Sequence, residues 1–214
     1  MTRKVFFFEI LLIAAALVAT VLLYPRLPAK VPIHWNLHSQ PDNYGPRWVL
    51  YLLGPGFMAA VMGLTWLLPW LSPKRFEIAG FLQTYNRVML LLFAMMAYVF
   101  GALLWADCGR AIDMGRTILC GACLFLVLVG NVMGKLRRNF YIGVRTPWAL
   151  ADERVWNATH RFAAKTFVAG GLVGLALSLG GLGLWAVVAI LLPGLASTVY
   201  SLIYYKQLEH RQEL

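Results

Sequence analysis

The chain has 214 residues, of which 60% are hydrophobic and only 13% are charged, and its mean hydropathy is +0.68. Soluble domains carry about 25% charged residues, so this composition excludes a soluble globular protein and predicts an integral membrane protein. The net charge of +10 does not indicate nucleic-acid binding, because the cations flank apolar runs, where they set topology and contact anionic lipid headgroups.

Six apolar stretches are long enough to cross a bilayer, which takes about 20 helical residues. The predicted membrane helices are roughly 5–24, 48–71, 88–106, 117–134, 166–182 and 184–205. The last two come from one uncharged run, which the glycines at 180–183 divide by a tight turn. The predicted fold class is an all-α integral membrane protein, a bundle of six transmembrane helices in a lipid bilayer.

Lysine and arginine are distributed unevenly over the connecting segments. Of the 19 such residues, the ones on the side opposite the amino terminus are Arg26, Lys30, Arg47, Arg110 and Arg116. Cytoplasmic loops carry the excess of these residues, so both termini are predicted to be cytoplasmic. The first apolar stretch also resembles a signal peptide, but it is longer than the usual core of roughly 7 to 15 residues, so an uncleaved helix is favoured.

Two long connecting segments organise the chain. Residues 1–71 are predicted to form an amino-terminal helix pair with an extracytoplasmic loop at 25–47. Residues 72–214 are predicted to form a four-helix region with a cytoplasmic loop at 135–165. Gly54-Pro55-Gly56 should break or kink the second helix, and Gly170 and Gly174 should give a close-packing face in the fifth.

The loop at 25–47 contains histidines with a metal-ligand spacing. His34, His38 and Asp42 follow one another at intervals of four, so on a continuous helix they would share a face. Pro41 and the turn-like sequence at 43–46 argue against such a helix. We therefore expect a folded surface loop without bound metal, and a metal site stays the alternative. The other candidate residues of this loop are Trp35, Asn36 and Tyr44.

Two polar residues fall inside predicted membrane helices. Glu9 lies about one turn from the helix end, where it is either an anchor that reaches the interface or pairs with Arg3 or Lys4, or a functional carboxylate. Asn131 is expected to form a hydrogen bond between helices rather than to bind a ligand.

The loop at 135–165 carries the most information. Gly143 permits a positive φ, and Pro147 forces Thr146 into extended geometry and can open a helix, so this turn can fix the direction of Arg145. Asp152 can cap a following helix. On that helix one polar row is expected at 154, 157, 161 and 165, and a second row, which includes Trp156 and His160, should face the bundle. This pattern predicts an interfacial amphipathic helix leading into the fifth membrane helix.

The same loop resembles the signature of the SdpI family of bacterial membrane proteins. That pattern runs Asn, aromatic, Ile-Gly-Ile-Arg-Thr-Pro-Trp-Thr-Leu, a short polar spacer, Val-Trp and Thr-His. The matching positions are Asn139, Ile142, Gly143, Arg145, Thr146, Pro147, Trp148, Leu150, Val155, Trp156, Thr159 and His160. The departures, Val144 and Ala149, are mild. Segments 27–28, 31–36 and 41–45 also resemble the amino-terminal domain of uncharacterised function that often precedes this signature.

The resemblance implies a multi-pass protein of the bacterial inner membrane. The family is named for immunity to a secreted antimicrobial peptide toxin, and some members are linked to signalling through a repressor held at the membrane. The first hypothesis is therefore immunity or sensing, with a peptide toxin at the outer loop and a cytoplasmic repressor or other regulator as partners. No cofactor is expected, and no enzymatic reaction is firmly attached to the family.

Two other hypotheses remain open from the sequence. The second is a transporter or lipid-handling membrane enzyme with a polar cavity near the inner leaflet. That cavity would be lined by Glu9, Asn131, Arg145 and His160. The third is purely structural, with the signature holding the fold together.

Overall fold

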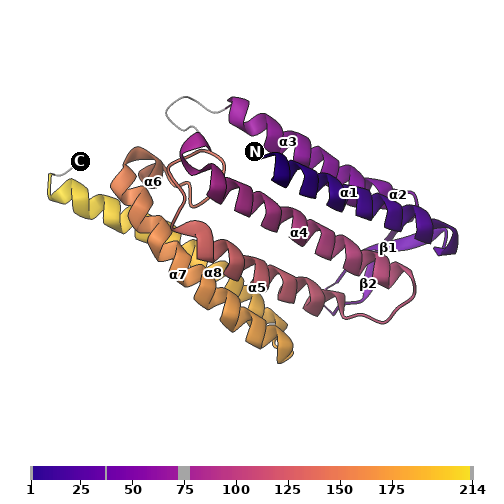
Figure 1. Ribbon diagram of the computed structural model, residues 1–214. Helices are drawn as coiled ribbons and strands as arrows, with labels where there is room; N and C mark the ends of the chain where they lie inside the picture. Colours follow the sequence, from indigo (N-terminus) through magenta and orange to yellow (C-terminus); the bar gives the residue numbers. More distant parts are fainter. Residues whose placement is uncertain (1, 37, 72–77, 213–214) are drawn as a thin grey trace.

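The computed structural model describes residues 2–36, 38–71 and 78–212, and in this part of the chain six helical spans are long and apolar enough to cross a membrane (Figure 1). The elements that form these spans are α1 (Arg3–Leu23), α2 (Val49–Tyr51) with α3 (Phe57–Leu71), α4 (Leu82–Asp107), α5 (Met114–Met133), α7 (Glu153–Leu179) and α8 (Gly183–His210). The predicted all-α, six-helix class is confirmed.

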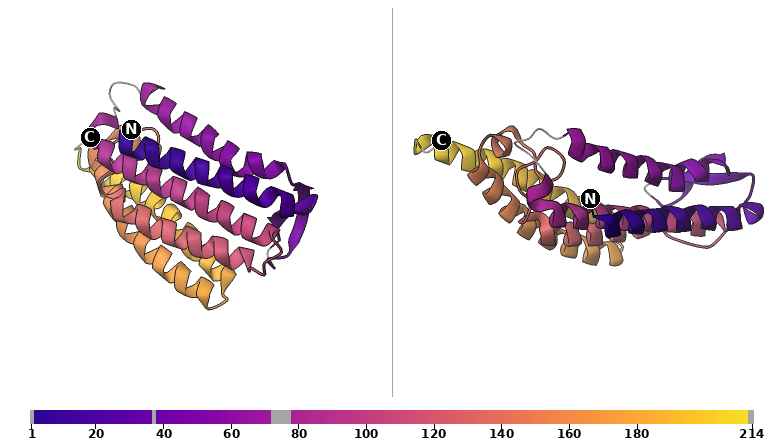
Figure 2. Two further views of the ribbon diagram at one scale, coloured as in Figure 1. Left: turned by 45° about the vertical axis from the view of Figure 1, so that its right-hand side comes forward. Right: turned by 45° about the horizontal axis from the view of Figure 1, so that its top comes forward.

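Successive spans alternate in direction, so the bundle has two distinct ends (Figure 1). One end carries both termini and residues 134–152, and we call it the signature end; the other carries residues 24–48, and we call it the hairpin end. Helices α5, α7 and α8 pack together, and α4 lies between this group and α1. Helix α3 lies at the outer edge of the bundle (Figure 2).

Two clusters of buried apolar side chains form the core. The cluster towards the signature end includes Tyr85, Val155 and Trp156. The cluster towards the hairpin end includes Val31 and Leu50 and draws on α1, α2 and α4. Because α4 contributes to both clusters, it joins the two parts of the chain. The predicted division into 1–71 and 72–214 stays a prediction, and residues 72–77 next to its boundary lie outside the described residues.

The loop at 25–47 forms an antiparallel hairpin of β1 (Lys30–Trp35) and β2 (Pro41–Pro46). The turn expected at 43–46 was wrong, because these residues belong to β2. The chain reverses instead after Asn36, whose side-chain oxygen accepts from the backbone N–H groups of His38 and Gln40 at 2.9 and 3.0 Å. Prolines are tolerated in these strands because each strand of a two-stranded sheet has an unpaired edge.

Proline and glycine shape the helices as predicted. The second span contains a π-helical turn at Leu52–Gly56, which includes Pro55. Glycines of α7 allow close helix contacts: a Cβ on Gly171 would lie 2.7 Å from the Cys123 carbonyl oxygen of α5, and one on Gly170 would lie 2.6 Å from the Ala189 carbonyl oxygen of α8. The small-residue face therefore serves helix packing.

The amphipathic segment predicted before the fifth membrane helix is continuous with it. Helix α7 runs without a break from Glu153 to Leu179, with Asp152 as its N-cap. Residues 153–179 contain no proline, and the helix runs through them unbroken. The polar row therefore occupies the first turns of a membrane-spanning helix.

Candidate functional site

Asn139 organises the loop that follows α5. Its side chain is fully buried, and its amide nitrogen donates to the carbonyl oxygens of Arg137 and Ile142 at 2.8 and 3.2 Å. Its side-chain oxygen accepts from the backbone N–H groups of Tyr141 and Ile142, both at 2.8 Å. Both amide protons and both acceptor sites of the side chain are thereby used within the loop.

Gly143 and His160 are in direct contact. Gly143 has φ of +112°, and a Cβ at this position would lie 2.2 Å from His160 Nε2. The Val144 N–H donates to the same nitrogen at 3.1 Å, while Nδ1 lies 2.8 Å from the Trp156 carbonyl oxygen. Nδ1 therefore donates and Nε2 accepts, which assigns the neutral tautomer with its proton on Nδ1. His160 thus fastens the loop to α7, and neither ring nitrogen is left for another role.

Trp156 completes this buried contact. Its ring stacks on the His160 ring with centroids 3.9 Å apart, and both side chains are fully buried. The indole N–H donates to the Leu136 carbonyl oxygen at 2.7 Å. The predicted row of Trp156 and His160 towards the bundle is confirmed, and the Trp156 indole N–H and His160 Nε2 bond to the loop backbone.

Thr146 and Pro147 begin the short helix α6 (Pro147–Ala151), as the sequence predicted. The Thr146 hydroxyl accepts from the Ala149 N–H at 3.2 Å and lies 2.8 Å from the Ser201 hydroxyl of α8. Trp148 is half-buried against the core cluster of the signature end. Arg138 closes the other end of α6 by donating to the carbonyl oxygens of residues 150 and 151 at 3.2 and 3.1 Å.

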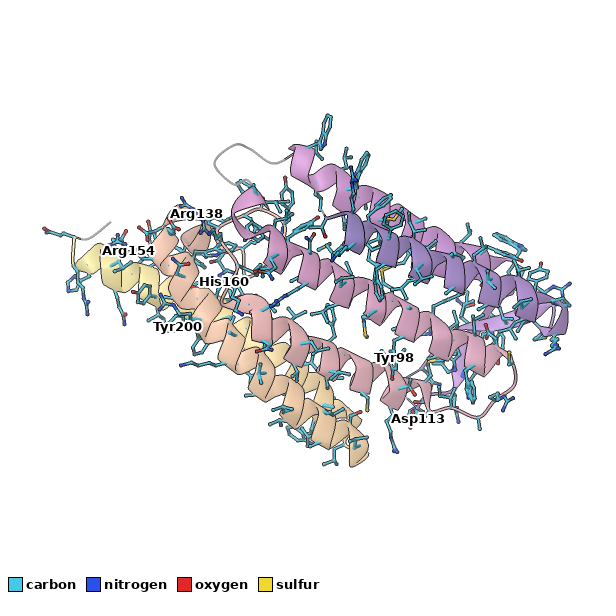
Figure 3. All side chains as sticks on the ribbon, in the orientation of Figure 1. Tyr98, Asp113, Arg138, Arg154, His160 and Tyr200 are labelled. Atoms are coloured by element: carbon cyan, nitrogen blue, oxygen red, sulfur yellow. The ribbon has the colours of Figure 1, made fainter. Side chains whose placement is uncertain are left out.

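Arg145 points out of the loop. Its side chain is exposed, and its guanidinium donates to the Phe140 carbonyl oxygen within the same loop. Figure 3 shows Arg138, Arg154, His160 and Tyr200 near one another at the signature end. The signature residues Asn139, Trp156 and His160, which unlike Arg145 are buried, direct their polar groups to backbone atoms of the loop and of α7.

Thr159 is the exception in this network. It is fully buried, but its hydroxyl has no hydrogen-bond partner among the described residues. A buried hydroxyl without a partner costs free energy, so we expect Thr159→Val to leave the unfolding free energy unchanged or to raise it by up to about 1 kcal/mol. Thermal unfolding of the detergent-purified protein measures this change, and a loss of more than about 1 kcal/mol would contradict the unsatisfied state of the hydroxyl.

Asp152 fixes the start of α7. Its Oδ1 accepts from the Arg154 N–H at 2.7 Å, and the Arg154 guanidinium donates to both carboxylate oxygens at 3.2 and 3.1 Å. These contacts with the Arg154 side chain are the largest reason that the pKa of the Asp152 carboxyl lies below its usual range, and backbone N–H groups add to them. The N-cap therefore stays ionised beside the positive end of the helix.

Glu9 makes no ion pair with Arg3 or Lys4, so that expectation was wrong. Glu9 is fully buried, whereas both cations are exposed on other faces of α1. The geometric reason is the spacing, because residues five and six positions apart do not share a helix face. Neither carboxylate oxygen has a hydrogen-bond partner among the described residues. A functional carboxylate stays the remaining prediction for Glu9.

Asn131 does not form the expected hydrogen bond between helices. Its side chain is exposed on α5, and no hydrogen bond joins it to another described residue. Arg145 is also exposed, and both ring nitrogens of His160 are bonded within the protein, so these observations argue against the polar cavity of the transporter hypothesis. None of these residues lines the two cavities described below.

A cavity of about 710 Å³ lies at the hairpin end, between β1 and helices of the bundle. Three predicted loop residues, His34, Trp35 and Asn36, line it. Most other lining residues are apolar, and they include the methionines Met58, Met95, Met96 and Met114. Ligand pockets span roughly 300–1,000 Å³ and are mostly apolar with a few polar groups, so this cavity has the size and chemistry of a binding site.

The hairpin is attached to α5 beside this cavity. The Ser39 hydroxyl donates to Asp113 Oδ1 at 2.5 Å and accepts from the Gly115 N–H at 3.0 Å. Asp113 is the N-cap of α5, and the Arg116 N–H and the Ser39 hydroxyl hold the pKa of its carboxyl below the usual range. The position of the hairpin is therefore coupled to the start of α5, and Figure 3 shows Asp113 at this end of the bundle.

The remaining hairpin candidates are exposed. His34 Nδ1 and Asp42 Oδ1 lie 2.5 Å apart across the two strands, while His38 lies in the turn, beside Ser39 and Asp113. Tyr44 is 53% exposed on β2. Within the described ranges no three His, Cys, Asp or Glu side chains gather as metal ligands. The spacing of four matters on a helix, but here His34 and His38 lie on a strand and a turn.

Sequence reasoning missed the methionines that line the cavity and the hydrogen bond that attaches the hairpin to α5. The methionines lie on three different helices, and only the adjacent pair Met95-Met96 is a visible signal in the sequence. Ser39 and Asp113 are far apart in sequence and meet only in the fold. Ser201, the partner of Thr146, carries no local signal for that contact.

These features define a multi-pass α-helical membrane protein with a hydrogen-bonded loop at one end and a hairpin beside an apolar cavity at the other. Residues 135–204 match the SdpI/YfhL protein family, and residues 11–59 match a domain of unknown function, DUF1648. The resemblance of the signature loop to the SdpI family is therefore confirmed over residues 135–204.

One relative is similar over nearly the whole chain. The sequence is 28% identical to the immunity protein SdpI of Bacillus subtilis (strain 168) over an alignment of 203 residues. This alignment covers 94% of this chain and 95% of that protein. No solved structure matches this chain.

Proposed function

We propose that this protein confers immunity to, or senses, a secreted antimicrobial peptide, and that the peptide binds at the hairpin-end cavity. The observation that carries the proposal is the cavity itself, lined by residues of the hairpin and by a methionine-rich apolar wall. Its support is the similarity to an immunity protein over most of the chain.

The chemistry of the cavity suits an amphipathic peptide. Methionine side chains are flexible and polarizable, so they adapt to apolar side chains of different shapes. Two of the lining residues, Leu52 and Phe57, are 57% and 58% exposed on the membrane-spanning surface. A peptide that has entered the bilayer can therefore reach the cavity from the lipid side, while His34 and Asn36 offer polar contacts.

We further propose that the hairpin end lies outside a bacterial cytoplasmic membrane and that both termini are cytoplasmic. The excess of lysine and arginine at the signature end supports this orientation. A bound peptide would then change the position of the hairpin, and the contact of Ser39 with Asp113 connects that change to α5. A cytoplasmic repressor at the signature end stays a prediction from the family resemblance.

Filling the cavity should weaken protection. Val99 lines the cavity from α4, and in Val99→Trp the larger ring occupies space that a peptide would need. We expect roughly a tenfold loss of protection, which corresponds to about 1.4 kcal/mol of binding free energy. The measurement is survival of a sensitive bacterial host that expresses each variant and is exposed to secreted peptides of related bacteria, with membrane abundance determined in parallel.

Val187→Trp is the matched control, because Val187 is 37% exposed on α8 and does not line the cavity. This variant should protect as well as the unchanged protein. Full protection by Val99→Trp at equal abundance would exclude the cavity as the binding site. Absence of protection by the unchanged protein against every peptide tested would count against the immunity function itself.

A further inference from the structure

A groove at the signature end is lined by cations from α7 and aromatic rings from α8. Its volume is about 480 Å³. The residues that carry its chemistry are Arg154, Asn157, Arg161 and Lys165 of α7 and Tyr200 and Tyr204 of α8. The polar row predicted from helical spacing is therefore one wall of a groove, and Figure 3 shows Arg154 and Tyr200 on neighbouring helices at this end.

The groove has an excess of positive charge. Its lining includes three cationic side chains and no carboxylate. Arg154 is paired with Asp152. Arg161 Nε contacts only the Asn157 carbonyl oxygen at 3.4 Å, and no ion pair joins Arg161 or Lys165 to a carboxylate in the described part of the chain. Both exposed cations therefore favour an anionic ligand.

The aromatic rings of the groove stack on one another and present polar atoms. The rings of Phe162 and Tyr200 stack with centroids 4.4 Å apart, and those of Tyr200 and Tyr204 lie 6.0 Å apart. Neither tyrosine hydroxyl bonds to another described residue. Tyrosine has an apolar body and a polar tip, so it is suited to the boundary between hydrocarbon and water.

The depth of the groove matches the headgroup region. Lys165 is the last charged residue before an uncharged run that extends to Lys206, so it marks the edge of the hydrocarbon on α7. Two turns beyond it on the same helix face, Leu172 is 55% exposed. The surface therefore changes from cationic to apolar along α7, in the direction in which a phospholipid changes from phosphate to acyl chain.

We propose that this groove binds the phosphate of an anionic phospholipid headgroup in the leaflet at the signature end. Arg161 and Lys165 supply the positive charge, and the Tyr200 and Tyr204 hydroxyls are available to donate to phosphate oxygens. The acyl chains lie along the apolar face of α7 beyond Lys165. This site shares no residue with the hairpin-end cavity, so the lipid-binding proposal does not depend on the proposed immunity function.

The test uses the full-length protein in phosphatidylcholine nanodiscs with and without phosphatidylglycerol. Native mass spectrometry measures retained phosphatidylglycerol relative to phosphatidylcholine, and thermal unfolding reports the folded state. We expect Arg161→Gln/Lys165→Gln to lower the preference for phosphatidylglycerol roughly tenfold, because each cation near a membrane surface adds substantially to the attraction. The control Lys135→Gln/Arg211→Gln removes the same charge from exposed positions at the same end and should retain the preference.

Each outcome decides the proposal. An unchanged preference in the Arg161/Lys165 variant, or an equal loss in the control, would overturn the site in favour of general surface charge. Stabilisation by inorganic phosphate in phosphatidylcholine alone would assign the groove to soluble phosphate and overturn the lipid as its occupant. If the double variant does not fold, Lys165→Gln alone should lower the preference roughly threefold, and an unchanged preference there would also overturn the proposal.

Discussion

We expect Gly143→Ala to remove about 3 kcal/mol from the free energy of unfolding and to lower the amount of folded protein in the membrane. Two costs add at this position. The backbone has φ of +112°, which alanine rarely adopts, and the new Cβ would lie 2.2 Å from His160 Nε2. The imidazole cannot move away without losing its bonds to Val144 and Trp156. Thermal unfolding in detergent measures the loss.

Gly109 provides the matched control. It also has a positive φ, +74°, but a Cβ there would have no heavy atom within 4 Å. Gly109→Ala should therefore cost only the backbone term, about 1 kcal/mol. If the two variants are equally destabilised, the contact between residue 143 and the imidazole is not what requires glycine.

Local sequence patterns predicted the parts of the fold that depend on local physics. Hydrophobic length located the six spans, and the helix start at Pro147 and the cap at Asp152 were found where the sequence placed them. Gly143 was expected to permit a positive φ, and it does. The same reasoning failed at 43–46, because proline, asparagine and glycine also occur in a short, exposed strand.

The candidate sites depended on contacts that no local pattern contains. The hairpin-end cavity combines a strand with residues from the π-helical turn and from α3, α4 and α5, so its wall could not be assembled from helical spacing. The polar row of α7 was predicted, but its aromatic partners on α8 lie about 40 residues later in the chain. Family resemblance identified the signature, while only the structure showed that His160 bonds to the backbone of the loop.

The hydrogen bonds of the signature residues to the backbone change how variants of the signature should be interpreted. Asn139, Trp156 and His160 use their polar groups within the protein, so their replacement acts first on the stability of the loop. A loss of protection in such variants reports function only when membrane abundance is unchanged. Variants of the hairpin-end cavity avoid this particular ambiguity, because no residue of the signature loop lines that cavity.

His160→Ala should lower the free energy of unfolding by about 3 kcal/mol. The change leaves the Val144 N–H and the Trp156 carbonyl oxygen without their partner, and it removes the ring that stacks on Trp156. His210→Ala is the control, because His210 is exposed at the same end of the bundle, and it should cost less than about 0.5 kcal/mol. Denaturant unfolding in detergent, supported by membrane abundance, measures both variants.

The double variant Gly143→Ala/His160→Ala tests the contact itself. Without the imidazole, the methyl group at position 143 no longer meets Nε2, so in this background Gly143→Ala should cost only about 1 kcal/mol for its positive φ. The double variant should therefore be about 2 kcal/mol more stable than the sum of the two single losses predicts. Additive losses would mean that the two residues act separately. A coupling of the expected size would instead show that Gly143 is required because His160 occupies the space beside it.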